Sequence, residues 1–323
     1  MKISNLIKTL VARINLIHGK TMPLRIAHFI TTRCNLSCSF CGCNKMLYTE
    51  MGCDEIKEAM LAFNKLGTFA WGFTGGEPFL RNDLPELLKF AKSLDFYTSV
   101  VTNGILIEKI KKTSCADIDF IMVSFHGKED RAKSICGEKH TNKVFETIDF
   151  LSSRKFNTCL SSTFDENSLD DMKYTIEYAK SKNIYCSFEP IFDFATQAED
   201  KGRVSNPAIL KKLINNVNFL IEQKKKKAPI WNSLSYLEWV KNYGRPNNFY
   251  CYAGKLYATL MPDGILRRCP KYGNEEKSGN YGYDFKKLNS EPHKCYCYPW
   301  CHVEYSRNFS LHPATILNTL KRL

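Results

Sequence analysis

The stretch Arg33-Cys-Asn-Leu-Ser-Cys-Ser-Phe-Cys41 places three cysteines within eight residues. Three thiolates at this spacing can bind three irons of a cubic 4Fe-4S cluster, and without a fourth ligand one iron stays open to substrate. A cluster with an open iron can bind a substrate, which indicates a catalytic role and not a storage role. A zinc site and chance clustering are the alternatives. Zinc sites usually pair two short cysteine or histidine arms, and no second arm lies nearby in the sequence.

A second motif, Thr74-Gly-Gly-Glu-Pro78, follows the apolar run 69–73 and stands at the end of an expected strand. Together the C-x3-C-x-Phe-x-C spacing and this GGEP motif, one strand later, resemble the radical S-adenosylmethionine (radical SAM) superfamily. The resemblance implies a 4Fe-4S cluster that binds S-adenosylmethionine (SAM) and cleaves it reductively to a 5'-deoxyadenosyl radical, which abstracts hydrogen from a substrate. The implied cluster ligands are Cys34, Cys38 and Cys41.

The 323 residues can bury a full core, and the length favours a domain of about 200 residues with a smaller one. Fourteen cysteines without a signal peptide favour a reducing, cytoplasmic location. No apolar run approaches the roughly 20 residues of a membrane-spanning helix. The net charge of +13 favours anionic partners without choosing among them, and a lysine-rich solvated surface explains it equally well.

From residue 24 onward, segments of strand character alternate with helical ones. The first helix, at 54–66, should end at Gly67, and capping boxes should begin two others, Asp83 with Glu86 and Ser168 with Asp171. Six strand-helix units in a row imply a parallel sheet, short of a full eight-unit barrel. We therefore expect an α/β fold, a partial (β/α)6 TIM-like barrel as in the superfamily, with a small C-terminal cysteine-rich auxiliary domain. The expected strands are 25–31, 69–74, 96–102, 119–124, 158–163 and 185–189.

Several polar residues stand at strand ends, where barrels place their ligand loops. The resemblance implies that Glu77 meets the methionine ammonium of SAM, that the backbone of Gly75 and Gly76 approaches closely, and that Phe40 lies near the adenine. It assigns ribose and carboxylate binding to further strand-end residues, each of which is equally well an ordinary turn residue. These are Asn103, Ser124, and Ser161 or Thr163, with His126 as a candidate on the substrate side.

Residues 1–20 show apolar positions at three-and-four spacing with basic residues elsewhere, which indicates an amphipathic helix. It either packs on the outside of the main domain or contacts a lipid surface. The lysine run 224–227, after a long helix expected from about 206, indicates a boundary. The expected domains are an N-terminal helix at 1–23, a radical SAM partial barrel at 24–228 and an auxiliary-cluster domain at 229–323.

Beyond residue 230 the chain is rich in aromatic residues, glycine and cysteine. Cys251 is followed by Gly264 after twelve residues and by Cys269 after four more, across a hairpin-like turn at 261–264. This half resembles SPASM and twitch auxiliary-cluster domains, whereas the later cysteines are fewer than in a full SPASM domain. The resemblance implies one auxiliary 4Fe-4S cluster on Cys251, Cys269 and two of Cys295, Cys297 and Cys301, with a zinc-bound hairpin as the alternative. The spare cysteine, Cys297 or Cys301 among the candidates, is a core thiol or a catalytic hydrogen donor.

The leading functional hypothesis is a radical SAM enzyme acting on a non-peptide small molecule or carrier-bound substrate, by dehydrogenation, epimerisation or carbon-carbon bond formation. A membrane-lipid-modifying enzyme and a peptide or protein maturase are alternatives. The maturase is disfavoured because only 33 residues precede Cys34, too few for a leader-binding domain. A zinc or iron-sulfur nucleic-acid-binding module is the alternative of another class. The expected partners are a small-molecule or lipid substrate, a flavodoxin- or ferredoxin-like electron donor and a peripheral membrane contact through residues 1–20; nucleic acid is not expected.

Overall fold

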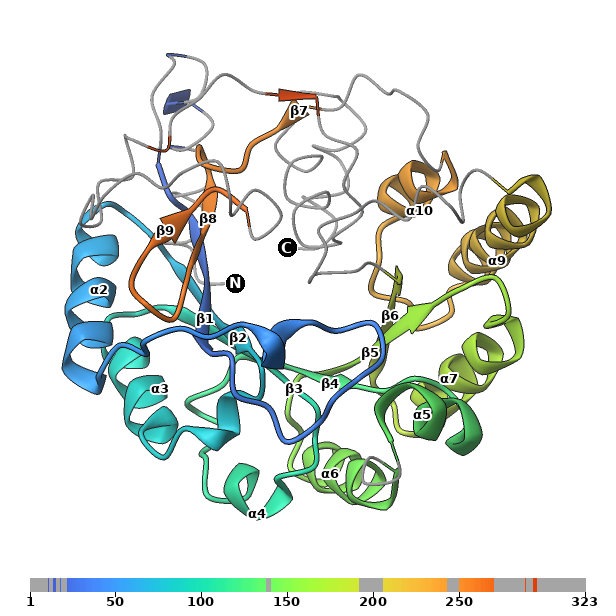
Figure 1. Ribbon diagram of the computed structural model, residues 1–323, viewed down its shortest axis with the longest axis horizontal. Helices are drawn as coiled ribbons and strands as arrows, with labels where there is room; N and C mark the ends of the chain where they lie inside the picture. Colours follow the sequence, from blue (N-terminus) through green and yellow to red (C-terminus); the bar gives the residue numbers. More distant parts are fainter. Residues whose placement is uncertain are drawn as a thin grey trace.

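A curved sheet with helices on its outside forms the centre of the computed structural model (Figure 1). The structure describes residues 11, 14, 15, 18, 22–137, 141–191, 206–242, 250–269, 288, 293 and 294. Strands β1 to β6 lie side by side in chain order, and every pair of neighbours among them is parallel. This is the expected partial (β/α)6 TIM-like barrel, so the predicted fold class is confirmed.

The six expected strands form within two residues of their predicted ends. They are β1 (Arg25–Thr31), β2 (Ala70–Gly75), β3 (Tyr97–Thr102), β4 (Phe120–Ser124), β5 (Thr158–Phe164) and β6 (Tyr185–Pro190). The helices between them are α2 (Cys53–Lys65), α3 (Leu84–Ser93), α4 (Ile107–Ile110), α5 (Glu129–Cys136), α6 (Thr141–Ser153) and α7 (Leu169–Ser181). Two 3-10 turns, η1 (Cys43–Lys45) and η2 (Pro78–Leu80), lie in the loops after β1 and β2.

Two further strands extend the sheet beyond β1. Strand β8 (Tyr257–Leu260) pairs with β1 in parallel, and β9 (Leu266–Arg267) pairs with β8 in antiparallel orientation. The hairpin turn expected at 261–264 joins them, with Gly264 at a φ of 79°. Helices α9 (Pro207–Lys225) and α10 (Leu234–Lys241) precede this hairpin, and a short antiparallel pair, β7 (Tyr250–Cys251) with β10 (His293–Lys294), stands apart.

Only some of the helix ends form as the sequence predicts. Gly67 ends α2 with a φ of 92°, as expected, and the Asn206 side chain caps α9. Both predicted capping boxes are wrong. The Asp83 carboxylate bonds instead to the Arg81 guanidinium, at 2.9 and 2.5 Å, and the Ser168 hydroxyl donates to Asp165 Oδ1 at 2.7 Å. Each of these side chains bonds to a residue two or three positions before it and does not cap its helix.

Most of the predicted N-terminal amphipathic helix lies outside the described residues. Val11 and Ile14 are described and exposed. None of the helices in the described ranges combines the length and hydropathy that crossing a membrane requires.

The layer between the sheet and α2 contains an imidazole in an apolar environment. His28 of β1 is completely buried and meets the Trp71 indole edge-on at 5.6 Å between ring centroids. Neither ring nitrogen of His28 has a hydrogen-bond partner among the described residues. Burial, reinforced by the positive charge of Arg81, lowers the pKa of His28 from 6.5 to about 3. The ring is therefore neutral at physiological pH.

We expect His28 to make the protein less stable in mild acid. The folded-state pKa is depressed, so the unfolded chain binds the extra proton between pH 6.5 and 3, and the free energy of unfolding falls across that window as the pH falls. At pH 5 the loss should be about 2 kcal/mol. Urea unfolding of the wild type and His28→Leu at pH 7 and pH 5 measures this difference. His18→Gln, at an exposed position, is the control; an equal loss in His28→Leu would contradict the assignment.

Candidate functional site

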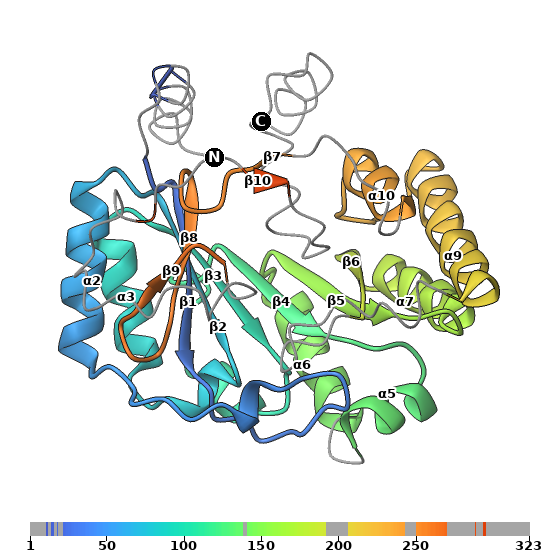
Figure 2. The ribbon, with the colours of Figure 1, turned by 45° about the horizontal axis from the view of Figure 1, so that its top comes forward.

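The three N-terminal cysteines lie in the loop at residues 32–52 between β1 and α2, called the cysteine loop below. Figure 2 shows this long blue loop passing the tips of the strands and reaching α5. Cys34, Cys38 and Cys41 are half-buried. Burial raises the pKa of the Cys34 thiol, and negative charge on Glu77, Cys38 and Cys41 raises it further, so these groups face a common region.

The donor set fits a cubic cluster. Each thiolate of such a cluster binds a different iron, so the sulfurs surround the cluster and need not converge on one point. Within the described ranges, no three His, Cys, Asp or Glu side chains are arranged to hold a single metal ion. Sequence reasoning overlooked another thiol of this loop, Cys43, which is buried and whose pKa burial raises to about 12. Cys43 therefore stays protonated at neutral pH.

The GGEP motif extends the pairing of β1 and β2 into the cysteine loop. The backbone N–H of Gly76 donates to Thr31 O at 2.8 Å, and that of Glu77 donates to Arg33 O at 2.9 Å. A Cβ on Gly75 would lie 2.2 Å from Thr31 O, and one on Gly76 would lie 2.1 Å from Arg33 O. Both glycines are thus required by the chain's own backbone immediately before Cys34.

Glu77 is completely buried, and its carboxylate bonds to groups of the chain. Oε1 accepts from Thr102 Oγ1 at 2.8 Å and from the Phe79 N–H at 3.1 Å, while Oε2 accepts from the Asn103 N–H at 2.7 Å. Burial raises the pKa of Glu77 to about 7, against the opposing effect of these hydrogen bonds. The side chain ties the end of β2 to the end of β3, a contact that the motif alone does not predict.

Asn103, which bonds to Glu77 through its backbone, also lies next to Cys34. Its amide nitrogen donates to Asn35 Oδ1 at 2.7 Å and lies 3.8 Å from Cys34 Sγ. Its amide oxygen accepts from the Ile105 N–H at 3.0 Å. The predicted cofactor residues Glu77 and Asn103 are therefore brought together next to the cysteine loop.

The remaining predicted strand-end residues gather on β4 and β5. Ser124 and Ser161 are opposite each other in the strand register, and both are half-buried. Phe40 of the cysteine loop meets the His126 ring edge-on at 5.6 Å, and Thr163 Oγ1 lies 3.2 Å from His126 Nδ1. The structure thus places these candidates around the far end of the loop, separate from the group formed by Glu77 and Asn103.

Four residues close the base of the cysteine loop, here called the neck: Thr31, Arg33, Glu50 and Arg81. Glu50 accepts two hydrogen bonds from the Arg33 guanidinium, at 3.0 and 2.9 Å, and one from Thr31 Oγ1. Arg81 donates to the carbonyls of Ile30 and Met51, at 3.2 and 3.0 Å, from either side of the loop. Burial raises the pKa of Glu50, but the bonds from Arg33 and Thr31 outweigh it and hold the pKa below its ordinary value. No spacing pattern in the sequence indicated this network.

The β8–β9 hairpin packs against the same neck. The Met51 N–H donates to Pro262 O at 2.8 Å, and the Arg267 guanidinium lies 5.8 Å from the Tyr48 ring centroid. Cys251 and Cys269, the first two predicted auxiliary ligands, are buried, and Cys251 Sγ lies 3.2 Å from Tyr257 Oη. Cys295, Cys297 and Cys301 lie outside the described residues.

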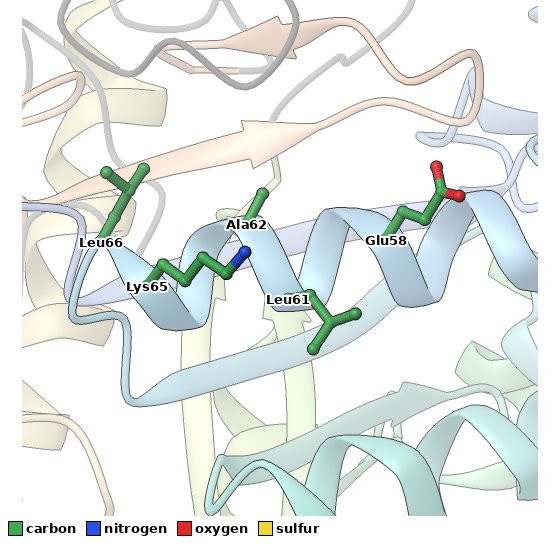
Figure 3. A pocket seen from close by; sticks show the side chains of 5 residues that line it. All are labelled: Glu58, Leu61, Ala62, Lys65 and Leu66. Carbon is green, nitrogen blue, oxygen red and sulfur yellow. The ribbon is translucent and has the colours of Figure 1, made fainter.

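A pocket of about 560 Å³ opens on the outer face of α2 (Figure 3). Its lining is Glu58, Leu61, Ala62, Lys65 and Leu66. None of the residues predicted to bind a metal or a cofactor lines it.

Comparison with known proteins agrees with this geometry. Residues 29–179 match the model of the radical SAM superfamily, and the matched range contains both the cysteine loop and the GGEP motif. The chain contains a radical SAM domain. It is a radical SAM enzyme, and the family implies a 4Fe-4S cluster and SAM as cofactors.

Solved structures of radical SAM enzymes share the fold of this chain. Streptococcus suis SuiB bound to precursor peptide SuiA has a TM-score of 0.67 at 15% identity, over 86% of this chain and 67% of that one. The enzyme anSMEcpe with bound AdoMet and Cp18Cys peptide has a TM-score of 0.63 at 17% identity, over 90% and 85%. Its complex with Kp18Cys peptide has a TM-score of 0.64 at 18% identity, over the same shares.

These structures correct the expected partner. We expected a small-molecule or lipid substrate, and that expectation is wrong, because the enzymes of similar fold are bound to peptides. The error came from treating the short segment before Cys34 as evidence against a peptide.

We expect Glu50→Gln to loosen the cysteine loop. An amide cannot replace the charge-assisted bonds to Arg33, so the variant should lose about 1–2 kcal/mol of stability and release iron faster to a chelator. Chelator-dependent bleaching of the reconstituted protein measures the release rate. Glu58→Gln, exposed on α2, is the matched control. Equal release from all three proteins would show that the neck does not hold the loop.

Proposed function

We propose that this radical SAM enzyme abstracts hydrogen from a peptide or protein substrate. The observation that carries the proposal is the likeness of the fold to SuiB bound to precursor peptide SuiA, over 86% of the chain. The likeness to anSMEcpe in its peptide complexes, over 90% of the chain, supports it independently. Dehydrogenation, epimerisation and carbon-carbon bond formation are the outcomes open to a peptide radical.

We assign the cluster to Cys34, Cys38 and Cys41, whose thiols share one loop and one electrostatic environment. When bound and reduced, the cluster supplies the electron that cleaves SAM and generates the hydrogen-abstracting radical. The residues of the chain hold the loop at its neck, align the ends of β2 and β3, and keep the approach to Cys34 free of side chains at Gly75 and Gly76.

Glu77 and Asn103 are assigned to the SAM-binding side of this site. Glu77 bonds to the Asn103 N–H and so fixes the strand end that faces the first cysteine. We therefore assign the Glu77 carboxylate to positioning as well as to the methionine ammonium. Phe40, with Ser124, Ser161 and Thr163, borders the other end of the loop, on the side we assign to adenine, ribose and carboxylate.

We also assign an auxiliary 4Fe-4S cluster to Cys251, Cys269 and two of Cys295, Cys297 and Cys301. Supporting this, His293 and Lys294, which immediately precede Cys295 in the chain, pair with Cys251 and Tyr250. The domain boundary is proposed at residues 228/229, and β8, which follows it in the chain, pairs with β1 of the main sheet. The spare cysteine, Cys297 or Cys301, is the proposed hydrogen donor for an epimerising reaction.

Replacement of a proposed ligand should remove the SAM-cleaving cluster. Cys41→Ala, reconstituted anaerobically, should hold about four irons fewer per chain than the wild type, because the cluster loses one of its three thiolates. It should also form no 5'-deoxyadenosine from SAM and dithionite. Cys115→Ala, at an exposed cysteine away from the loop, should match the wild type in both measurements. Wild-type iron content in Cys41→Ala would refute the ligand assignment.

Peptides should stimulate the reaction and be changed by it. The wild type, SAM and dithionite are incubated in D₂O with a mixture of random-sequence peptides, and 5'-deoxyadenosine and peptide masses are followed by mass spectrometry. Loss of two hydrogens indicates oxidation or cross-linking, and gain of one deuterium indicates epimerisation. Cys41→Ala is the control. Deoxyadenosine formation that is unaffected by peptides, with no peptide mass change, would contradict a peptide substrate.

A further inference from the structure

Cys136, the last residue of α5, brings another thiol to the cysteine loop. Its Sγ lies 2.9 Å from Cys38 Sγ, although 98 residues separate the two cysteines in the sequence. Cys136 is only 5% exposed. Neither the cysteine spacing nor the radical SAM motifs assign it a role.

The backbone builds this approach. The Ser39 N–H donates to Ile135 O at 2.8 Å, so the residues next to both cysteines are also bonded to each other. Helix α5 is fixed at its other end, where the Lys128 N–H donates to Asp171 Oδ1 at 3.0 Å. The thiol of Cys136 is therefore presented to Cys38 by a helix that is anchored on both sides.

The chemistry of the pair determines which sulfur donates. Cys38 must give up its proton to bind iron, and a ligating thiolate is then an acceptor only. A second thiolate at this distance would be repelled by the first. Two cluster ligands also bind different irons, so their sulfurs diverge around the cluster and do not touch. Cys136 is thus suited to remain a thiol beside a ligand and not to be a ligand itself.

We propose that Cys136 is a positioning residue that donates an S–H···S hydrogen bond to the Cys38 thiolate and raises the reduction potential of the N-terminal cluster. The inference rests on the proposed assignment of Cys38 as a ligand. Hydrogen bonds to the sulfurs are among the factors that set the potential of an iron-sulfur cluster. A donor withdraws negative charge from the sulfur and so favours the reduced, more negative cluster.

The test compares Cys136→Ala, Cys136→Ser and Cys115→Ala with the wild type by iron content and by a redox titration of the SAM-free cluster followed by electron paramagnetic resonance. Cys136→Ala should keep wild-type iron, while its ratio of reduced to oxidised cluster, at the wild-type midpoint, falls about tenfold, which is 59 mV for one electron. Cys136→Ser retains a donor and should restore most of the potential. Cys115→Ala should not differ from the wild type.

An unchanged midpoint in Cys136→Ala would overturn the hydrogen bond. Iron loss in Cys136→Ala equal to that in Cys38→Ala would also overturn it, because Cys136 would then be a ligand. If the alanine variant does not fold, Cys136→Val, which fills more of the space without a donor, carries the same expectations. Failure of the proposed site gives a different result, namely wild-type iron in Cys38→Ala. The potentials are measured without any peptide, so the expected differences between the variants hold whether or not the substrate is a peptide.

Discussion

Two backbone hydrogen bonds, from Gly76 to Thr31 and from Glu77 to Arg33, connect the end of β2 to the start of the cysteine loop. They continue the parallel pairing of β1 and β2 one step past the strands, so the residue before Cys34 is held as firmly as a sheet residue. The absence of side chains at Gly75 and Gly76 permits this approach, since a Cβ at either position would overlap a carbonyl of the partner segment. The Glu77 carboxylate then fastens the end of β3 to the same point.

The cysteine loop is long, and it is ordered by the bonds that close its base and by contacts with residues outside the loop. Glu50 and Arg33 close its base, and Arg81 bonds to carbonyls on both sides of it. The β8–β9 hairpin covers the neck from one side and α5 holds the far end from the other. A three-ligand cluster depends on such an arrangement, because its fourth corner receives no support from the protein.

The sequence predicted the fold well because apolar periodicity and strand-end motifs report local structure. All six strands and the glycine turn at Gly67 appear where the pattern placed them. The capping boxes at Asp83 and Ser168 failed because both side chains bond to residues just before the helix, Arg81 and Asp165, which the capping motif does not include. The cysteine spacing likewise predicts Cys38 but not Cys136, because the two residues are distant in the sequence and come together only in the folded chain.

The internal bonding of the site divides its polar groups into two sets. Glu77, Asn103, Arg33 and Glu50 are bonded among themselves or to neighbouring backbone, so their first task is to fix the cysteines relative to the strands. The half-buried side chains of Ser124, Ser161 and Thr163 stand on β4 and β5, beyond the reach of that network. We infer that the β1–β3 half of the barrel orders the cysteine loop and that the β4–β5 half presents the polar side chains that we propose for the adenine, ribose and carboxylate of SAM.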